Sequence, residues 1–182
     1  MAHPGPTVRQ LLTLLDEAFR RKSWHGTNLR GSIRGLTAAQ AAWCGRPGGR
    51  RIVDIVVHCA YWKYAVRRRL RGEKRGSFPL TGSNWLELVD PVTSAAWREY
   101  VRLLEEQHRQ LIAAVAELSD GALADTPAGR TVSNGMLVRG VALHDVYHTG
   151  QIQSLKAARA RGNRLPATSV TAAARKIGRA HV

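Results

Sequence analysis

Apolar residues recur along much of the chain at the three- and four-residue steps of amphipathic helices. The first such stripe covers residues 7–22, and Thr7 is its candidate N-cap. The second covers residues 51–71, and Gly72 follows it as a natural end of a helix. Both segments are therefore predicted to be helices that bury one face.

Two longer stripes follow in the second half of the chain. Asp90 and Pro91 predict the start of a third helix, because aspartate caps helices and proline suits the first helical position. Ser133 is the expected N-cap of a fourth helix, which we predict over residues 135–161. Residues 72–90 show no sustained period, so a long loop is expected between the second and third helices.

Four long helices and no convincing strand predict an all-α fold. Amphipathic helices of this length bury their stripes against one another, so we expect an up-and-down four-helix bundle with long connecting loops. One domain is expected over residues 1–165, followed by a disordered tail over residues 166–182. Residues 176–182 read like a translated sequencing adapter, and we expect them to be an artefact.

Composition narrows the class of protein. No run of about 18 apolar residues occurs, so no membrane span is predicted. The first residues lack the charged and apolar regions of a secretory signal, and a cytoplasmic location is expected. Cys44 and Cys59 have no disulfide-framework spacing, which fits two reduced thiols.

The formal net charge of +15 could attract nucleic acid or an anionic surface. Most basic residues are arginines in a chain rich in alanine and glycine, which suits a GC-rich coding sequence, so the charge is partly compositional. The basic run over residues 67–75 is the best anion-binding candidate, although cations near a helix C-terminus also stabilise the helix dipole. Nucleic acid is therefore not the expected partner.

His144 and His148 are four residues apart in the fourth predicted helix, so their side chains project from one face about 6 Å apart. They continue the apolar stripe, and buried imidazoles need partners for their ring nitrogens. Two interpretations stay open: hydrogen bonds to the backbone, Asp145 or Tyr147, or a shared divalent metal. His58, at the inner face of the second helix, could complete a three-histidine site with positions open for water or substrate.

Several side chains are candidates for the surroundings of this site. Asp54 lies one helical turn before His58 and could orient its ring. His25 is a candidate fourth ligand or rim residue. Gln151 and Tyr147 flank the histidine pair, and Tyr147 either hydrogen-bonds a substrate or, as we expect, packs between helices.

Other chemistry is less well supported by the sequence. His108 lies on the inner stripe of the third helix between Leu104 and Leu111, and we expect an ordinary core histidine there. Cys59 and His58 are consecutive, so their side chains diverge on a helix and a Cys–His nucleophile is not expected. The catalytic residues therefore stay unassigned.

Two segments resemble the DinB/YfiT-like superfamily. Residues 140–156, GVALHDVYHTGQIQSLK, resemble its C-terminal signature. Residues 52–73, IVDIVVHCAYWKYAVRRRLRGE, resemble its second helix, which carries the first histidine ligand. The elements SWHG, at residues 23–26, and SNW, at residues 83–85, are similar to features of one branch, and the resemblance spans roughly residues 8–159.

The resemblance implies a four-helix bundle in which His58, His144 and His148 bind a divalent metal, with zinc or nickel expected. It also implies a homodimer and a small-molecule substrate. Family members with known activities transfer low-molecular-weight thiols or isomerise substrates with a thiol cofactor, and many have no assigned reaction. The family name comes from DNA-damage induction, which is no evidence of DNA binding.

We therefore expect a metal-dependent enzyme whose three-histidine site activates a low-molecular-weight thiol or water for transfer to an electrophilic small molecule. Such an enzyme would be a transferase or a hydrolase. The alternative is a non-catalytic, metal-stabilised dimeric bundle that binds anionic partners through its arginine-rich surface.

Overall fold

The computed structural model describes residues 4–74, 76, 78–127 and 131–162, and helices dominate these ranges. The elements are α1 (Pro6–Phe19), α2 (Leu29–Ser32), α3 (Ala38–Ala42), α4 (Ile52–Leu70), α5 (Ser94–Ala116), the 3-10 turn η1 (Gly121–Leu123) and α6 (Asn134–Gly162). The described ranges contain no strand, only an isolated bridge between Ser23 and Gly26, which confirms the all-α prediction. The tail expected over residues 166–182, with its adapter-like end, lies outside the described residues.

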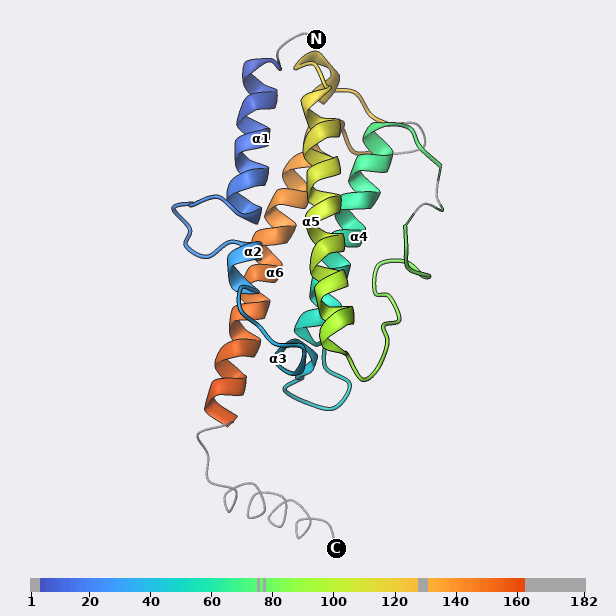
Figure 1. Cartoon of the computed structure of the whole chain (residues 1–182). Helices are drawn as coiled ribbons and strands as arrows, with labels where there is room; N and C mark the ends of the chain where they lie inside the picture. The colour runs from blue at the N-terminus through green and yellow to red at the C-terminus, as the bar shows by residue number, and fades with distance from the viewer. Residues whose placement is uncertain (1–3, 75, 77, 128–130, 163–182) are drawn as a thin grey trace, which may run out of the picture.

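The four long helices form the predicted four-helix bundle with long connections, but not in strict up-and-down order (Figure 1). Helix α1 packs against α5 and α6, and α4 packs against the same two helices. Helices α4 and α5 run in the same direction, opposite to α1 and α6, because the long segment 71–93 returns the chain along the bundle (Figure 1). The short helices α2 and α3 lie in the connection from α1 to α4.

Two clusters of buried side chains fill the bundle. One joins Leu15 of α1, Leu111 of α5 and Val138 of α6. The other joins Ile55 of α4 and Ile152 of α6. Each aliphatic side chain buried in this way contributes about 1.5–3 kcal/mol to folding. Among the helices of the described ranges, none combines the length and the apolar character that a membrane crossing needs.

The start of α1 differs from the prediction. The helix begins at Pro6, and its N-cap residue is Gly5 rather than Thr7. The carboxylate of Asp120, from a distant loop, accepts the backbone N–H groups of Thr7 and Val8 at 3.0 and 2.9 Å. A Cβ atom on Gly5 would lie 2.4 Å from that carboxylate, so glycine makes room for the cap. A partner so far along the chain could not be read from local sequence.

The start of α5 was also wrongly predicted. Thr93, not Asp90, is the N-cap, and its side chain accepts the backbone N–H of Ala96 at 3.1 Å. The carboxylate of Asp90 instead accepts a hydrogen bond from the guanidinium of Arg51 at 3.2 Å. Asp90 therefore ties the long loop to the beginning of α4.

The C-terminal end of α4 and the N-terminal start of α6 agree with the prediction. Gly72 has a φ of 65°, the left-handed conformation that lets a chain leave a helix, directly after α4. The hydroxyl of Ser133 accepts the backbone N–H of Met136 at 3.3 Å and caps α6. By contrast, α1 ends at Phe19, earlier than the Lys22 that periodicity suggested.

Candidate metal centre

Three histidines from two helices meet between α4 and α6. The Nε2 atom of His144 lies 3.0 Å from Nε2 of His58 and 3.0 Å from Nε2 of His148. One ligand atom of each residue lies within 4.8 Å of the others. These residues, the three-histidine cluster, are a group that can hold a metal ion.

Residue spacing on α6 and the packing of α4 against α6 bring the three histidines together. His144 and His148 share a face of α6 because they are four residues apart. His58 reaches them from the middle of α4, which packs directly against α6. The pattern of inner-face positions predicted this meeting, because both helices bury the faces that carry the histidines.

The second ring nitrogen of two histidines faces an oxygen acceptor. Nδ1 of His58 lies 2.9 Å from the backbone carbonyl oxygen of Asn84, and Nδ1 of His148 lies 2.8 Å from Oε1 of Gln151. A carbonyl oxygen only accepts, so Nδ1 carries the hydrogen in both rings and Nε2 carries a lone pair. Both lone pairs point at Nε2 of His144, where a single N–H cannot satisfy both.

The ring of His144 completes this donor set. Its Nδ1 atom is buried and has no hydrogen-bond partner within the described part of the chain. Buried polar atoms without partners cost stability, so these three rings satisfy one another poorly by hydrogen bonds alone. A divalent cation at the centre would accept all three Nε2 lone pairs, and the donor set therefore fits a metal.

Burial keeps the three imidazoles neutral. It lowers the pKa of His58 to about 4, against the opposing effect of the hydrogen bond to Asn84. It lowers the pKa of His144 to about 3, and the neighbouring imidazoles act in the same direction. It also lowers the pKa of His148. At neutral pH each ring therefore keeps the lone pair that metal ligation requires.

The loop between α4 and α5 supplies two groups that the sequence did not assign. The ring of Trp85 stacks on His58, with the ring centroids 3.9 Å apart, and the guanidinium of Arg50 lies 4.2 Å from the centroid of Trp85. Asn84 has a φ of 62°, a conformation in which asparagine is enriched, and its side chain accepts the Trp62 indole N–H at 3.0 Å. The SNW element was the sequence signal for both residues, but it could not reveal their contacts.

Gln151 lies against the cluster, whereas Tyr147 differs from expectation. Gln151 accepts from His148 through Oε1 and donates to the hydroxyl of Tyr147 through Nε2 at 2.9 Å. Tyr147 is 64% exposed, so its expected packing between helices is wrong. The two side chains form a short hydrogen-bonded chain that orients the ring of His148.

The contacts expected of Asp54 and His25 are not made. The Asp54 carboxylate accepts the backbone N–H of Arg51 at 2.8 Å and its guanidinium at 2.9 Å, which closes the first turn of α4. The backbone of Asn84 takes the position at His58 Nδ1 that Asp54 was expected to fill. His25 is exposed in the loop after α1 and is not part of the three-histidine cluster.

A second set of buried polar side chains lies in the same bundle. Lys63 of α4 and Asp145 of α6 form an ion pair in which both side chains are fully buried. Burial raises the pKa of Asp145, and the ammonium of Lys63 opposes that effect. The ring of His108 stacks on Phe19 at a centroid distance of 3.9 Å, which confirms His108 as a core residue. We call Lys63, Asp145 and His108 the buried polar group.

A cavity of about 430 Å³ opens beside the cluster, and we call it the histidine pocket. His58 and His144 line it. Most of its other lining residues are apolar or aromatic, and they are Trp62, Val66, Val132, Met136, Leu137, Gly140 and Val141, with Asn84 and Arg69 as the polar members. A cavity of the size that holds small organic molecules therefore borders the three-histidine cluster.

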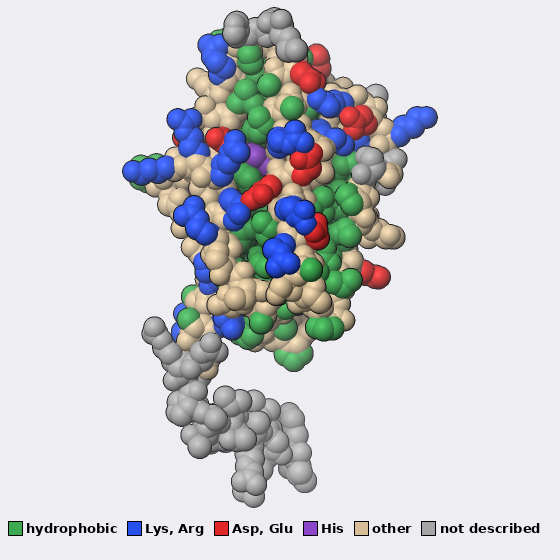
Figure 2. All heavy atoms as spheres, in the orientation of Figure 1, with side chains coloured by type: hydrophobic (Ala, Val, Ile, Leu, Met, Phe, Trp, Pro, Cys, Tyr) green, Lys and Arg blue, Asp and Glu red, His purple; other side chains and the backbone are tan. Residues whose placement is uncertain are grey.

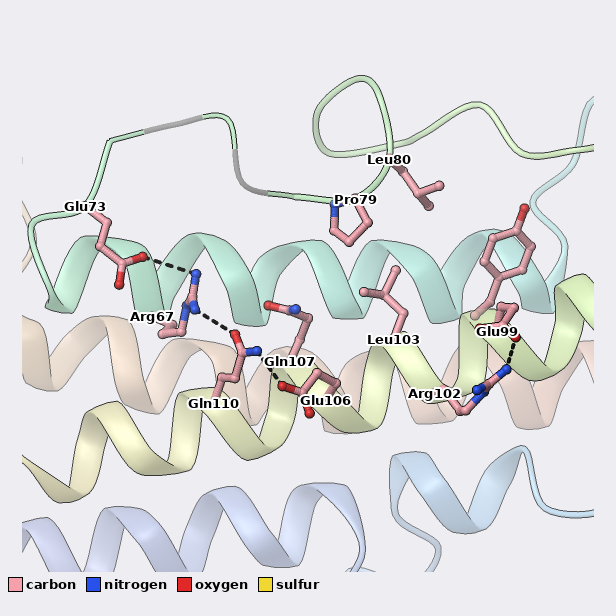
Figure 3. Close-up of a pocket in the computed structure, with 11 residues that line it drawn as sticks. Arg67, Glu73, Pro79, Leu80, Glu99, Arg102, Leu103, Glu106, Gln107 and Gln110 are labelled. Atoms are coloured by element: carbon pink, nitrogen blue, oxygen red, sulfur yellow. Dashed lines mark hydrogen bonds and ion pairs between the residues drawn. The ribbon is translucent and has the colours of Figure 1, made fainter.

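A larger cavity, of about 740 Å³, lies elsewhere, between α4, α5 and the long loop (Figure 3). None of the three clustered histidines lines it. Its charged and polar side chains contact one another: Arg67 lies 3.1 Å from Glu73 and donates to Gln110 at 2.6 Å, and Gln110 donates to Glu106 (Figure 3). We call this cavity the polar groove.

The basic run proposed as an anion site is partly engaged in ion pairs. Arg67 contacts Glu73, and Arg71 contacts Glu117 at 2.8 Å. Figure 2 shows Lys and Arg side chains spread over one face of the molecule, with Asp and Glu among them. Arg75 of this run lies outside the described residues. The described part of the run therefore does not form a uniform cationic patch.

Comparison with known proteins places the chain in a family. A model described as the DinB superfamily matches residues 23–152. The match covers most of the chain and includes His58, His144 and His148. No curated protein and no solved structure gives a match. The chain therefore belongs to the DinB superfamily.

Proposed function

We propose that the chain is a metal-dependent enzyme in which His58, His144 and His148 hold a divalent transition metal, zinc or nickel. In this proposal the site activates a low-molecular-weight thiol or water for transfer to an electrophilic small molecule. One observation carries it: three Nε2 atoms converge while carbonyl oxygens hold Nδ1 of two rings. Three neutral imidazoles are a donor set of catalytic zinc sites, in which a further position stays open.

The surrounding residues support such a site by orientation and by shielding. Gln151 and the backbone of Asn84 hold two rings with Nε2 inward, as outer contacts do in metal sites. Trp85 covers one face of His58 and limits the access of water. A bound divalent ion would supply Lewis acidity, which makes a thiol or water a stronger nucleophile.

The lining of the histidine pocket favours a thiol over water as the nucleophile. Apart from the histidines, its polar lining residues are Asn84 and Arg69, which are poor general bases at neutral pH. A thiol, with a pKa of about 8.5, gives up its proton far more readily than water does. The proposed reaction is therefore attack of the thiolate on the electrophile, with loss of its leaving group to solvent.

We also propose that the protein acts as a homodimer in the cytoplasm. One exposed side of α6, which includes the rim of the histidine pocket, carries Met136, Leu143 and Tyr147, and these side chains are 52%, 60% and 64% exposed. Exposed apolar side chains that follow one helix face are typical of an interface. Cys44 and Cys59 are free thiols, which fits a reducing compartment.

An activity assay tests the proposed function. Zinc-loaded protein is mixed with cysteine, glutathione or coenzyme A and with 1-chloro-2,4-dinitrobenzene, and thioether formation is followed. We expect thioether formation above the uncatalysed rate with at least one thiol, and loss of that activity after metal removal and in His148→Ala. His25→Ala is the matched control, because His25 is exposed and outside the cluster. Full activity of a folded His148→Ala protein would overturn the proposal.

A further inference from the structure

We propose that the electrophilic substrate binds in the histidine pocket as an uncharged molecule with an apolar body, and that Gly140 keeps the pocket open beside the histidines. This names the substrate class for the site of the proposed function and rests on that function for the reaction. Binding of an apolar molecule depends only on the pocket, so it can be measured in protein without metal.

The walls of the histidine pocket are mostly apolar. Its aliphatic and aromatic lining residues are Trp62, Val66, Val132, Met136, Leu137 and Val141. The polar groove differs, because two arginines and three glutamates line it. The volume of the histidine pocket, about 430 Å³, falls within the range of cavities that hold small organic ligands. A hydrocarbon chain or ring would be removed from water there, which favours an apolar ligand body.

The polar side chains that line the pocket, apart from the histidines, already have partners. The side-chain oxygen of Asn84 accepts the indole N–H of Trp62 at 3.0 Å. Arg69 is also engaged, and its guanidinium carbon lies 5.5 Å from the centroid of the Trp62 ring. Arg69 lines a neighbouring cavity as well, together with Glu73 and Asp125. An anionic ligand could therefore recruit Arg69 only at the expense of its present contacts.

The remaining lining offers no charge that would compensate a charged ligand. His58 and His144 are neutral rings in the proposed metal site, and none of the described lining residues is acidic. A carboxylate or an ammonium group that enters such a pocket loses its hydration, and no uncommitted opposite charge replaces the lost water. The pocket should therefore prefer an uncharged ligand to a charged one of the same shape.

Gly140 leaves a gap in the wall that α6 supplies. It lies one turn before His144, and both residues line the pocket. A Cβ atom on Gly140 would meet no neighbouring atom within 4 Å, so a side chain there would extend into open space. A large side chain would fill the part of the pocket next to His144. Glycine at this position therefore leaves room for a ligand beside the three-histidine cluster.

Three probes of one chain length test the preference for an uncharged ligand: octan-1-ol, octanoate and octylamine. Each is titrated by calorimetry into metal-free protein near pH 7, so that the carboxylate of octanoate cannot coordinate zinc. We expect octan-1-ol to bind at least about tenfold more tightly than either ion, because only the ions lose a charged group's hydration. Absence of octan-1-ol binding, or binding of either ion as tight as that of octan-1-ol, would overturn the proposal.

Gly140→Leu tests where the ligand binds. Leucine favours a helix more than glycine does and meets open space here, so the variant should fold, which circular dichroism checks. We expect its affinity for octan-1-ol to fall about tenfold or more. Gly150→Leu is the matched control, because Gly150 is an exposed glycine of α6 with equally open space that does not line the pocket. Equal affinities of the two variants would overturn the proposal.

Zinc affinity, measured by competition with a chromophoric chelator, separates this inference from the proposed function. Gly140→Leu should bind zinc as tightly as wild type, because Gly140 is not a member of the three-histidine cluster. If wild type binds no zinc but octan-1-ol binding still depends on Gly140, the proposed function fails and the ligand class stands. If zinc binds and thioether forms while octan-1-ol binding is insensitive to Gly140→Leu, the inference fails and the proposed function stands.

Discussion

The bundle buries imidazole side chains in two places, the three-histidine cluster and His108, and their surroundings differ. In the cluster, Nε2 atoms converge and oxygen acceptors orient two of the rings. His108 stacks on Phe19, and neither of its ring nitrogens has a hydrogen-bond partner among the residues described. Burial lowers the pKa in both places, to about 3 for His144 and about 2 for His108. A lowered pKa therefore marks burial, whereas convergence of oriented nitrogens marks a candidate site.

The largest expected difference between the two places is in metal affinity. His144→Ala removes the nitrogen that lies 3.0 Å from both other Nε2 atoms, so we expect zinc affinity to fall by about a thousandfold or more. His108→Ala should leave zinc affinity unchanged. Competition with a chromophoric chelator measures both. Equal zinc affinity of the two variants would remove the distinction between them.

Substitution of Lys63 tests the buried polar group through the free energy of unfolding. Lys63→Met leaves the Asp145 carboxylate fully buried without its cation, so the free energy of unfolding should fall by about 3–5 kcal/mol. Chemical denaturation of metal-free protein measures this loss. The double variant Lys63→Met/Asp145→Leu should recover most of it, because no charge is then left buried. A loss below about 1 kcal/mol in the single variant would show that the ion pair is not the buried contact described.

Gln151 tests whether orientation of a ring matters to the cluster. Gln151→Ala removes the acceptor that holds Nδ1 of His148, so zinc affinity should fall by about 10–100-fold. Gln153→Ala, two residues further along α6 and not a member of the three-histidine cluster, is the control. Unchanged affinity in Gln151→Ala would mean that the helix alone orients the ring.

The smallest expected effect is the pH dependence that His108 contributes. Above pH 6.5 the ring is neutral in the folded and the unfolded chain, so it adds no pH dependence. Below pH 6.5 the unfolded chain takes up a proton that the folded chain, with its pKa of about 2, does not. The free energy of unfolding should therefore fall by roughly 1 kcal/mol per pH unit in this range.

His108→Leu should remove this contribution and leave stability at pH 7 within about 1 kcal/mol of wild type. The comparison uses metal-free protein, so that acid release of a metal from the cluster does not contribute. Identical pH dependence of wild type and His108→Leu between pH 4 and 6 would contradict the assignment of His108 as a neutral core residue.

The sequence predicted those parts of the site that depend on local geometry. His144 and His148 follow from helix periodicity, and His58 follows from its inner-face position. The ion pair of Lys63 and Asp145 joins residues 82 positions apart, and no local pattern encodes such a partner. Asn84 acts through a backbone carbonyl, whose direction depends on loop dihedrals rather than on side-chain type.

The wrong predictions have a common physical cause, which is competition between partners. Asp54 was expected at His58, but Arg51 lies one turn earlier and binds its carboxylate. Asp90 was expected to cap α5, but the same Arg51 also engages it, and Thr93 caps the helix instead. Sequence identifies which groups can interact, and the packed chain decides which of them do.

Metal analysis of the purified protein tests the central claim most directly. Zinc or nickel is measured per chain in wild type, His144→Ala and His25→Ala, and X-ray absorption at the metal edge reports the ligands. We predict about one ion per chain in wild type and His25→Ala, bound by three imidazole nitrogens at about 2.0–2.1 Å, and almost none in His144→Ala. A wild-type protein that holds no stoichiometric metal, and whose melting temperature does not rise when zinc or nickel is added, would contradict the account.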